Sequence, residues 1–128
     1  MDEPLTLSWH KFHKLTEARS MFARIPCVYV QTDRDGHPIR VGKASDGLEA
    51  RYRGDTGYAI DAAMHGSENF VFVAAVPKYL CKAVEDELIW QGRQCLSYNN
   101  QGKAICPSQR IQIVHNGVPP KFDKFETV

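Results

Sequence analysis

Side chains that could do chemistry gather in one stretch of the chain, residues 27–43. Two apolar segments, 27–32 and 38–42, flank a turn that contains Asp35-Gly36, a strong signal for a β-hairpin. Tyr29 offers an aromatic hydroxyl, Gly42 a flexible backbone position and Lys43 a basic group just before a predicted helix. We therefore expect a small fold that presents these groups at the edge of a sheet.

The region around this hairpin is basic. Residues 11–53 contain nine Lys and Arg against five Asp and Glu, whereas the whole chain carries 16 and 15, for a formal net charge of +1. A local positive surface could contact phosphates, and such contacts would be sensitive to salt. An ordinary solvated surface can have the same composition, so this alternative stays open.

A carboxylate in the predicted helix 78–94 is the second chemical candidate. An apolar stripe at helical spacing defines this helix; its members are Leu80, Cys81, Val84 and Leu88. At about 100° per residue, Asp86 faces solvent, and Glu85 and Glu87 lie on the two margins of the stripe. Glu85 at the rim of the core is suited to a divalent cation, although acids that only aid solubility are the simpler explanation.

Further elements must position these groups. Trp9, Phe12 and Leu15, followed by Met21 and Phe22, predict an amphipathic N-terminal helix over residues 8–23. At that spacing, core packing explains Trp9 and Phe12 better than stacking on bases does. We expect this helix to lie on the sheet.

The remaining elements follow in order. Asp46 and Glu49 have the spacing of a capping box and predict a helix over residues 47–53. Residues 54–68 are punctuated by glycine and predict a loop with a short helix. The apolar run 69–76 predicts a buried strand, residues 97–103 a loop, and residues 110–115 a short C-terminal strand.

Length and composition indicate a single domain that spans residues 1–128. Hydrophobic residues make up 43% and charged residues 24%, as in globular domains. The four cysteines lack the paired spacing of a zinc site, and no apolar run approaches the ~20 residues that cross a bilayer. We therefore expect free thiols, no membrane partner and a cytoplasmic location.

The motifs occur in an order that resembles the GIY-YIG endonuclease domain. The match covers residues 27–99 and consists of Val28-Tyr29, Val41-Gly42-Lys43, Arg51, Glu85-x-x-Leu88-Ile89 and Tyr98-Asn99. The resemblance implies an α+β fold with a small, mostly antiparallel three-stranded sheet flanked by helices. It also implies hydrolysis of phosphodiester bonds in DNA with one divalent metal, Mg²⁺ or Mn²⁺, as in excision-repair nucleases and homing endonucleases.

The resemblance also assigns roles by position. Tyr29, Lys43, Arg51 and Glu85 would be catalytic, and Glu85 would bind the metal. Gly42 and Asn99 would support substrate binding. In the family these residues line one concave face. Charge develops on the phosphate oxygens during hydrolysis, and an arginine fork and a metal held by a carboxylate are suited to stabilise it.

Two residues depart from the family pattern. Cys27 replaces the glycine of the first motif, and Arg40 replaces the tyrosine of the second. Arg40 could take over as a phosphate contact, or the site could be altered. His65 lies where some members place a histidine, although a lone loop histidine is more often incidental. Tyr29 could equally be a packing residue.

The leading hypothesis is thus a metal-dependent DNA endonuclease. RNA stays open as a substrate, and because no zinc finger or helix-turn-helix signature is present, specificity would come from loops or a protein partner. The alternative is a non-catalytic module that binds nucleic acid or protein and retains the fold. The sequence leaves the oligomeric state undetermined.

Overall fold

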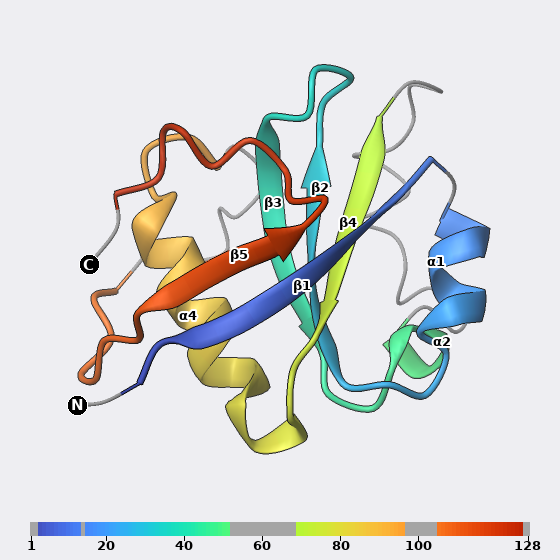
Figure 1. Ribbon diagram of the computed structural model, residues 1–128, viewed down its shortest axis with the longest axis horizontal. Helices are drawn as coiled ribbons and strands as arrows, with labels where there is room; N and C mark the ends of the chain where they lie inside the picture. Colours follow the sequence, from blue (N-terminus) through green and yellow to red (C-terminus); the bar gives the residue numbers. More distant parts are fainter. Residues whose placement is uncertain (1–2, 14, 52–68, 97–104, 127–128) are drawn as a thin grey trace.

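The computed structural model describes residues 3–13, 15–51, 69–96 and 105–126, and within these ranges strands and helices form an α+β fold (Figure 1). The strands are β1 (Leu5–Phe12), β2 (Cys27–Thr32), β3 (Pro38–Ala44), β4 (Phe70–Ala75) and β5 (Ile113–Gly117). The helices are α1 (Leu15–Met21), α2 (Leu48–Arg51) and α4 (Cys81–Gln91), the last preceded by a 3₁₀ turn, η2 (Lys78–Leu80).

The sheet is larger than predicted. The described strands form one five-stranded sheet in the order β3-β2-β4-β1-β5, in which β1 and β5 are parallel and every other pair is antiparallel. The three-stranded, mostly antiparallel sheet is therefore wrong, although the α+β class agrees with the structure. The motif-bearing strands β2, β3 and β4 are neighbours, and β1 and β5 extend the sheet beyond β4.

The N-terminal prediction failed because two periodicities overlap. Residues 5–12 form the strand β1, in which Leu7 and Trp9 are buried and their neighbours Thr6, Ser8 and His10 are exposed. This alternation has a period of two, which is the period of a strand. The spacing of Trp9, Phe12 and Leu15 resembles a helix, but α1 begins only at Leu15. The core position of Trp9 and Phe12 is nevertheless confirmed, since 2% and 7% of their surfaces are exposed.

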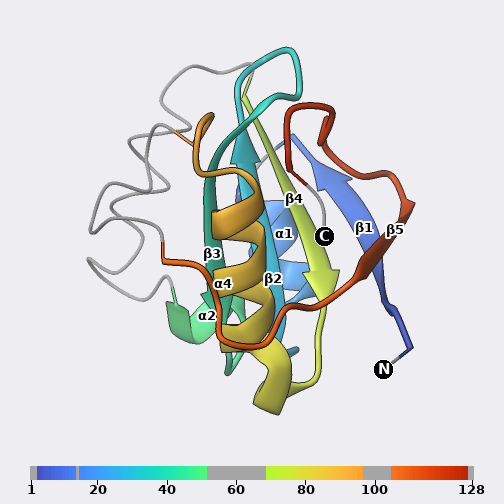
Figure 2. The ribbon, with the colours of Figure 1, turned by 90° about the vertical axis from the view of Figure 1, so that its left-hand side faces the viewer.

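The sheet separates two hydrophobic clusters. Helix α4 covers one face, where Val84 and Leu88 pack among Val28, Val30 and Val41. Helices α1 and α2 lie on the other face, where Ala18 and Leu48 pack near Tyr29. Figure 2 shows α4 in front of the sheet and α1 behind it. The two faces of the hairpin therefore meet different helices.

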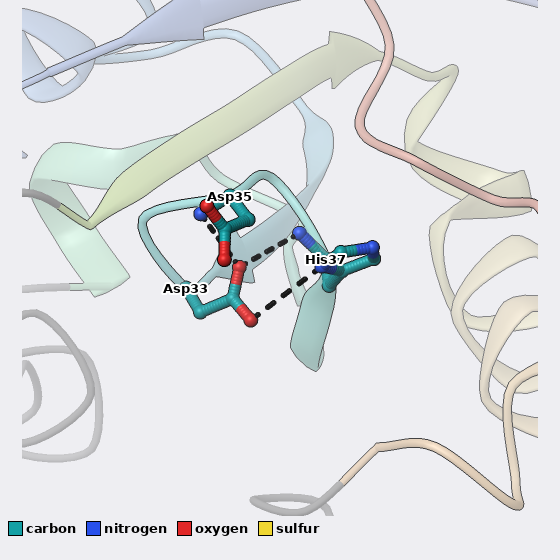
Figure 3. A group of neighbouring side chains, drawn as sticks. All are labelled: Asp33, Asp35 and His37. Carbon is teal, nitrogen blue, oxygen red and sulfur yellow. Dashed lines mark hydrogen bonds and ion pairs between the residues drawn. The ribbon is translucent and has the colours of Figure 1, made fainter.

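The β2–β3 hairpin is closed by its aspartate-rich turn (Figure 3). The Asp33 side chain accepts hydrogen bonds from the backbone amides of Asp35 at 2.9 Å and His37 at 3.0 Å. Gly36 has φ +86°, a conformation that glycine adopts without strain. The predicted hairpin is confirmed, and its second strand runs two residues further than expected.

The other local predictions had mixed outcomes. The strand 69–76 and the helix 78–94 correspond to β4 and to η2 with α4, whereas the final strand begins at Ile113 instead of 110. The predicted capping box does not form: the Glu49 amide donates to the Ala23 carbonyl, and the Asp46 carboxylate pairs with Lys78 at 2.8 Å. The predicted loops at 54–68 and 97–103 lie almost wholly outside the described residues.

All four cysteines are free thiols, and Cys27 and Cys81 are buried. Burial raises the pKa of the Cys27 thiol to about 12. Among the helices of the described ranges, none combines the length and apolar character needed to cross a membrane.

Candidate functional site

The hairpin brings Tyr29, Arg40 and Gly42 together on one face. Tyr29 is fully buried and pairs across the strands with Gly42. A Cβ atom at residue 42 would lie 2.3 Å from the Tyr29 hydroxyl oxygen. The tyrosine ring therefore covers this glycine and leaves no room for a side chain at this position. Arg40 Nη1 donates to the Tyr29 hydroxyl at 3.1 Å. Arg40, at the position where the resemblance would place a second tyrosine, therefore contacts Tyr29.

Lys43 and Glu85 meet on the other side of the hairpin. They line a cavity of about 440 Å³ together with Ser45, Asp46 and Ala50. Partial burial raises the pKa of the Glu85 carboxyl, while the nearby positive charge of Lys43, and more weakly that of Arg40, lowers it. A half-buried carboxylate beside a lysine is suited to bind a cation, either alone or together with a phosphate that the cation contacts.

Arg40 links the two groups. Tyr29 lies on the face that α1 and α2 cover, and Glu85 belongs to α4 on the opposite face, so the two do not share the single concave face expected from the family. Both approach β3, which is the terminal strand of the sheet. Arg40 on this strand donates a hydrogen bond to Tyr29, and its positive charge lowers the pKa of Glu85. The candidate site therefore straddles the β3 edge.

Three predicted residues cannot be placed in this site. Arg51 is the last residue of α2 and follows Ala50, which lines the cavity, but its side chain lies outside the described part of the structure. His65 and Asn99 lie outside the described residues altogether. Their assigned roles in the site stay predictions.

Glu85 and Glu87 occupy different environments, which sequence periodicity could not reveal. Glu87 is fully buried, and Arg110 binds both of its carboxylate oxygens, each at 2.9 Å. Gln91 donates to Glu87 at 2.8 Å and the Ile111 amide at 3.2 Å. Burial alone would raise the pKa of Glu87, but these hydrogen bonds outweigh it and lower the pKa. Glu87 is thus part of a structural ion pair, whereas the Glu85 carboxylate lines the cavity beside Lys43.

The hairpin turn holds a second acidic group. Asp33, Asp35 and His37 bring possible metal-ligand atoms within 4.8 Å of one another, and no other such group occurs among the described residues (Figure 3). Asp33 already uses one oxygen to close the turn, and its other oxygen lies 3.7 Å from His37 Nδ1. The turn itself accounts for this arrangement. Of these three residues, only Asp35 was part of the turn signal identified from the sequence, Asp35-Gly36.

Comparisons with known proteins add no relative. No protein-family model matches the chain, and no curated protein or solved structure matches it.

Proposed function

We propose that the protein is a metal-dependent endonuclease that hydrolyses phosphodiester bonds in DNA at the β3 edge. The observation that supports this most is the shared cavity of Glu85 and Lys43. Arg40, whose positive charge acts on Glu85, donates a hydrogen bond to the buried Tyr29. A carboxylate for a divalent ion, cations for phosphate oxygens and a hydroxyl near the same strand are the groups that such a reaction needs.

Each side chain has a separate task in this proposal. Glu85 would hold one Mg²⁺ or Mn²⁺ ion, for which oxygen ligands and a cavity with room for water and phosphate are suitable. When bound, this ion would polarise the phosphate and lower the pKa of a bound water. Lys43 and Arg40 would orient the phosphate and offset its charge. Tyr29 would orient the attacking water through its hydroxyl.

A nucleic-acid-binding module without catalysis is the second candidate. The burial of Tyr29 and the bond from Arg40 to its hydroxyl favour it, because a buried, occupied hydroxyl cannot contact water before Arg40 moves. Glu85 separates the two candidates, since a module that only binds has no need for a metal-binding carboxylate.

The test is nicking of supercoiled plasmid by the full chain with Mg²⁺ or Mn²⁺. We expect metal-dependent cleavage that Glu85→Ala and Arg51→Ala each reduce by about 100-fold. Asp86→Ala is the matched control, because Asp86 lies next to Glu85 on α4 but pairs with Lys82 at the surface, and it should cleave like the wild type.

The possible outcomes separate the candidates. Cleavage that survives both substitutions would contradict the proposed site. Binding of DNA without cleavage by the wild type, with either metal, would favour the binding module. Cleavage of RNA but not of DNA would retain the site and change the substrate.

A further inference from the structure

Gln31 is a buried polar residue that the fold leaves unsatisfied. Its side chain is fully buried in β2, and neither its amide oxygen nor its amide nitrogen has a hydrogen-bond partner among the described residues. Buried amides are nearly always paired, because water no longer satisfies them. An unpaired glutamine therefore destabilises the free protein and calls for a physical reason.

The position of Gln31 connects it with the candidate site. It follows Tyr29 by two residues on β2, so both side chains lie on the same face. Gln31 pairs directly with Arg40 on β3, and such opposite residues have Cβ atoms about 5 Å apart. A register shift follows between Gln31 and Thr32. Irregularities of this kind re-aim side chains near functional sites.

Arg40 lies near two possible hydrogen-bond acceptors, the Tyr29 hydroxyl and the Gln31 amide oxygen, and of these two it donates only to Tyr29. Its guanidinium donates to the Tyr29 hydroxyl, while the Gln31 amide across the strand pair accepts no hydrogen bond. We infer that Gln31 is a positioning residue for Arg40 in the substrate-bound state: its amide oxygen accepts a guanidinium N–H once Arg40 turns from the Tyr29 hydroxyl to a phosphate. This inference rests on the proposed function.

The exchange of partners has two consequences for the site. A guanidinium carries five N–H donors in a fixed plane, so a bond to Gln31 fixes that plane while other N–H groups face the phosphate. The same movement removes the hydrogen bond of Arg40 from the Tyr29 hydroxyl. Substrate binding thus satisfies an amide that is unpaired in the free protein, and the protein gains affinity at the expense of its stability when free.

The chain offers a matched pair of buried glutamines for the test. Gln31→Met removes the unpaired amide at similar length, and we expect it to raise Tm by about 3 °C and to lower kcat/KM for plasmid nicking about 10-fold. Gln91→Met is the control, because Gln91 donates to Glu87 at 2.8 Å. That variant should lower Tm and leave nicking at the wild-type rate.

A double-mutant cycle shows whether Gln31 acts through Arg40. We expect Arg40→Met to reduce kcat/KM, and Gln31→Met to have no added effect in the Arg40→Met background. Equal reductions in both backgrounds, or a lower Tm for Gln31→Met, would overturn the inference, because the amide would then act alone or be satisfied in the free protein.

The same cycle in binding separates this inference from the proposed function. The Kd for a short DNA duplex is measured in EDTA by fluorescence anisotropy. If the wild type binds DNA but does not cleave it in the presence of metal, only the nuclease proposal is contradicted. The double-mutant cycle measured in Kd then still decides the role of Gln31. Wild type that neither binds nor cleaves defeats both.

Discussion

At the scale of single residues, neighbours decide what a chemical group can do. Tyr29 and Glu85 carry the groups expected of a phosphodiesterase, but Tyr29 is covered and bonded to Arg40, whereas Glu85 is half-buried beside Lys43. Gly42 was expected to support substrate binding, which stays a prediction; the structure shows that it makes room for the Tyr29 ring. The role of each residue is thus set by its contacts as well as by its type.

His115 provides a prediction at this scale. Burial lowers its pKa to about 4, and Trp9 Nε1 donates to its Nδ1 at 2.9 Å, which requires that nitrogen to carry no proton. The unfolded chain has a pKa near the ordinary ~6.5 and therefore binds the proton first as pH falls. We expect the free energy of unfolding to decrease between about pH 6.5 and pH 4, as measured by urea denaturation.

NMR titration assigns this effect to His115. Its imidazole signals should shift with a midpoint near pH 4, and His115→Phe should flatten the dependence of stability on pH in that interval. A midpoint at the ordinary histidine value would contradict the neutral, half-buried state of His115.

At the scale of elements, long-range side-chain contacts attach the C-terminal part of the chain to the fold. Arg110, which lies three residues before β5, forms an ion pair with Glu87 on α4. Strand β5 itself pairs with β1. Trp9 on β1 also contacts His115 on β5. The start of β5 at Ile113 therefore depends on α4 and β1 as well as on its own residues.

The Glu87 ion pair gives the element-scale prediction. Arg110→Met would leave the fully buried Glu87 carboxylate without its cation, and we expect a loss of about 3 kcal/mol in the free energy of unfolding by urea denaturation. Lys82→Met is the control, because the Lys82–Asp86 pair on the same helix is exposed and should change stability by less than about 0.5 kcal/mol. Equal effects of the two substitutions would show that the buried pair adds nothing.

At the scale of the whole molecule, the motifs depend on residues outside the stretch 27–99 in which they occur. Residues 27–99 include β2, β3, β4 and α4, but β1 completes the sheet beside β4 and links it to β5. Leu7 and Trp9 from β1 lie in the same buried cluster as Val84 and Leu88 of α4. The site therefore rests on a core that the motif-bearing region cannot complete alone.

Removal of β1 tests this dependence. A chain without residues 1–13 loses three large buried side chains, Leu7, Trp9 and Phe12, each worth about 3 kcal/mol or more, and this sum is comparable to the whole stability of a small domain. We expect this chain to lack a cooperative thermal transition in circular dichroism. A chain without residues 1–3 should melt like the full chain, since Leu5 begins β1. A cooperative transition in the longer deletion would show that the core is complete without β1.

The sequence by itself determined the features that arise from local signals. The hairpin followed from its turn residues, β4 from its apolar run and α4 from its 3.6-residue stripe, and Glu85 was separated from the solvent-facing Asp86. Only the tertiary structure decided that residues 5–12 form a strand and that the five described strands share one sheet. It also decided that Glu87 forms an ion pair and that Gln31 is buried with no hydrogen-bond partner among the described residues. These features depend on segments distant in the sequence, such as Trp9 and His115, whose pairing leaves no local pattern.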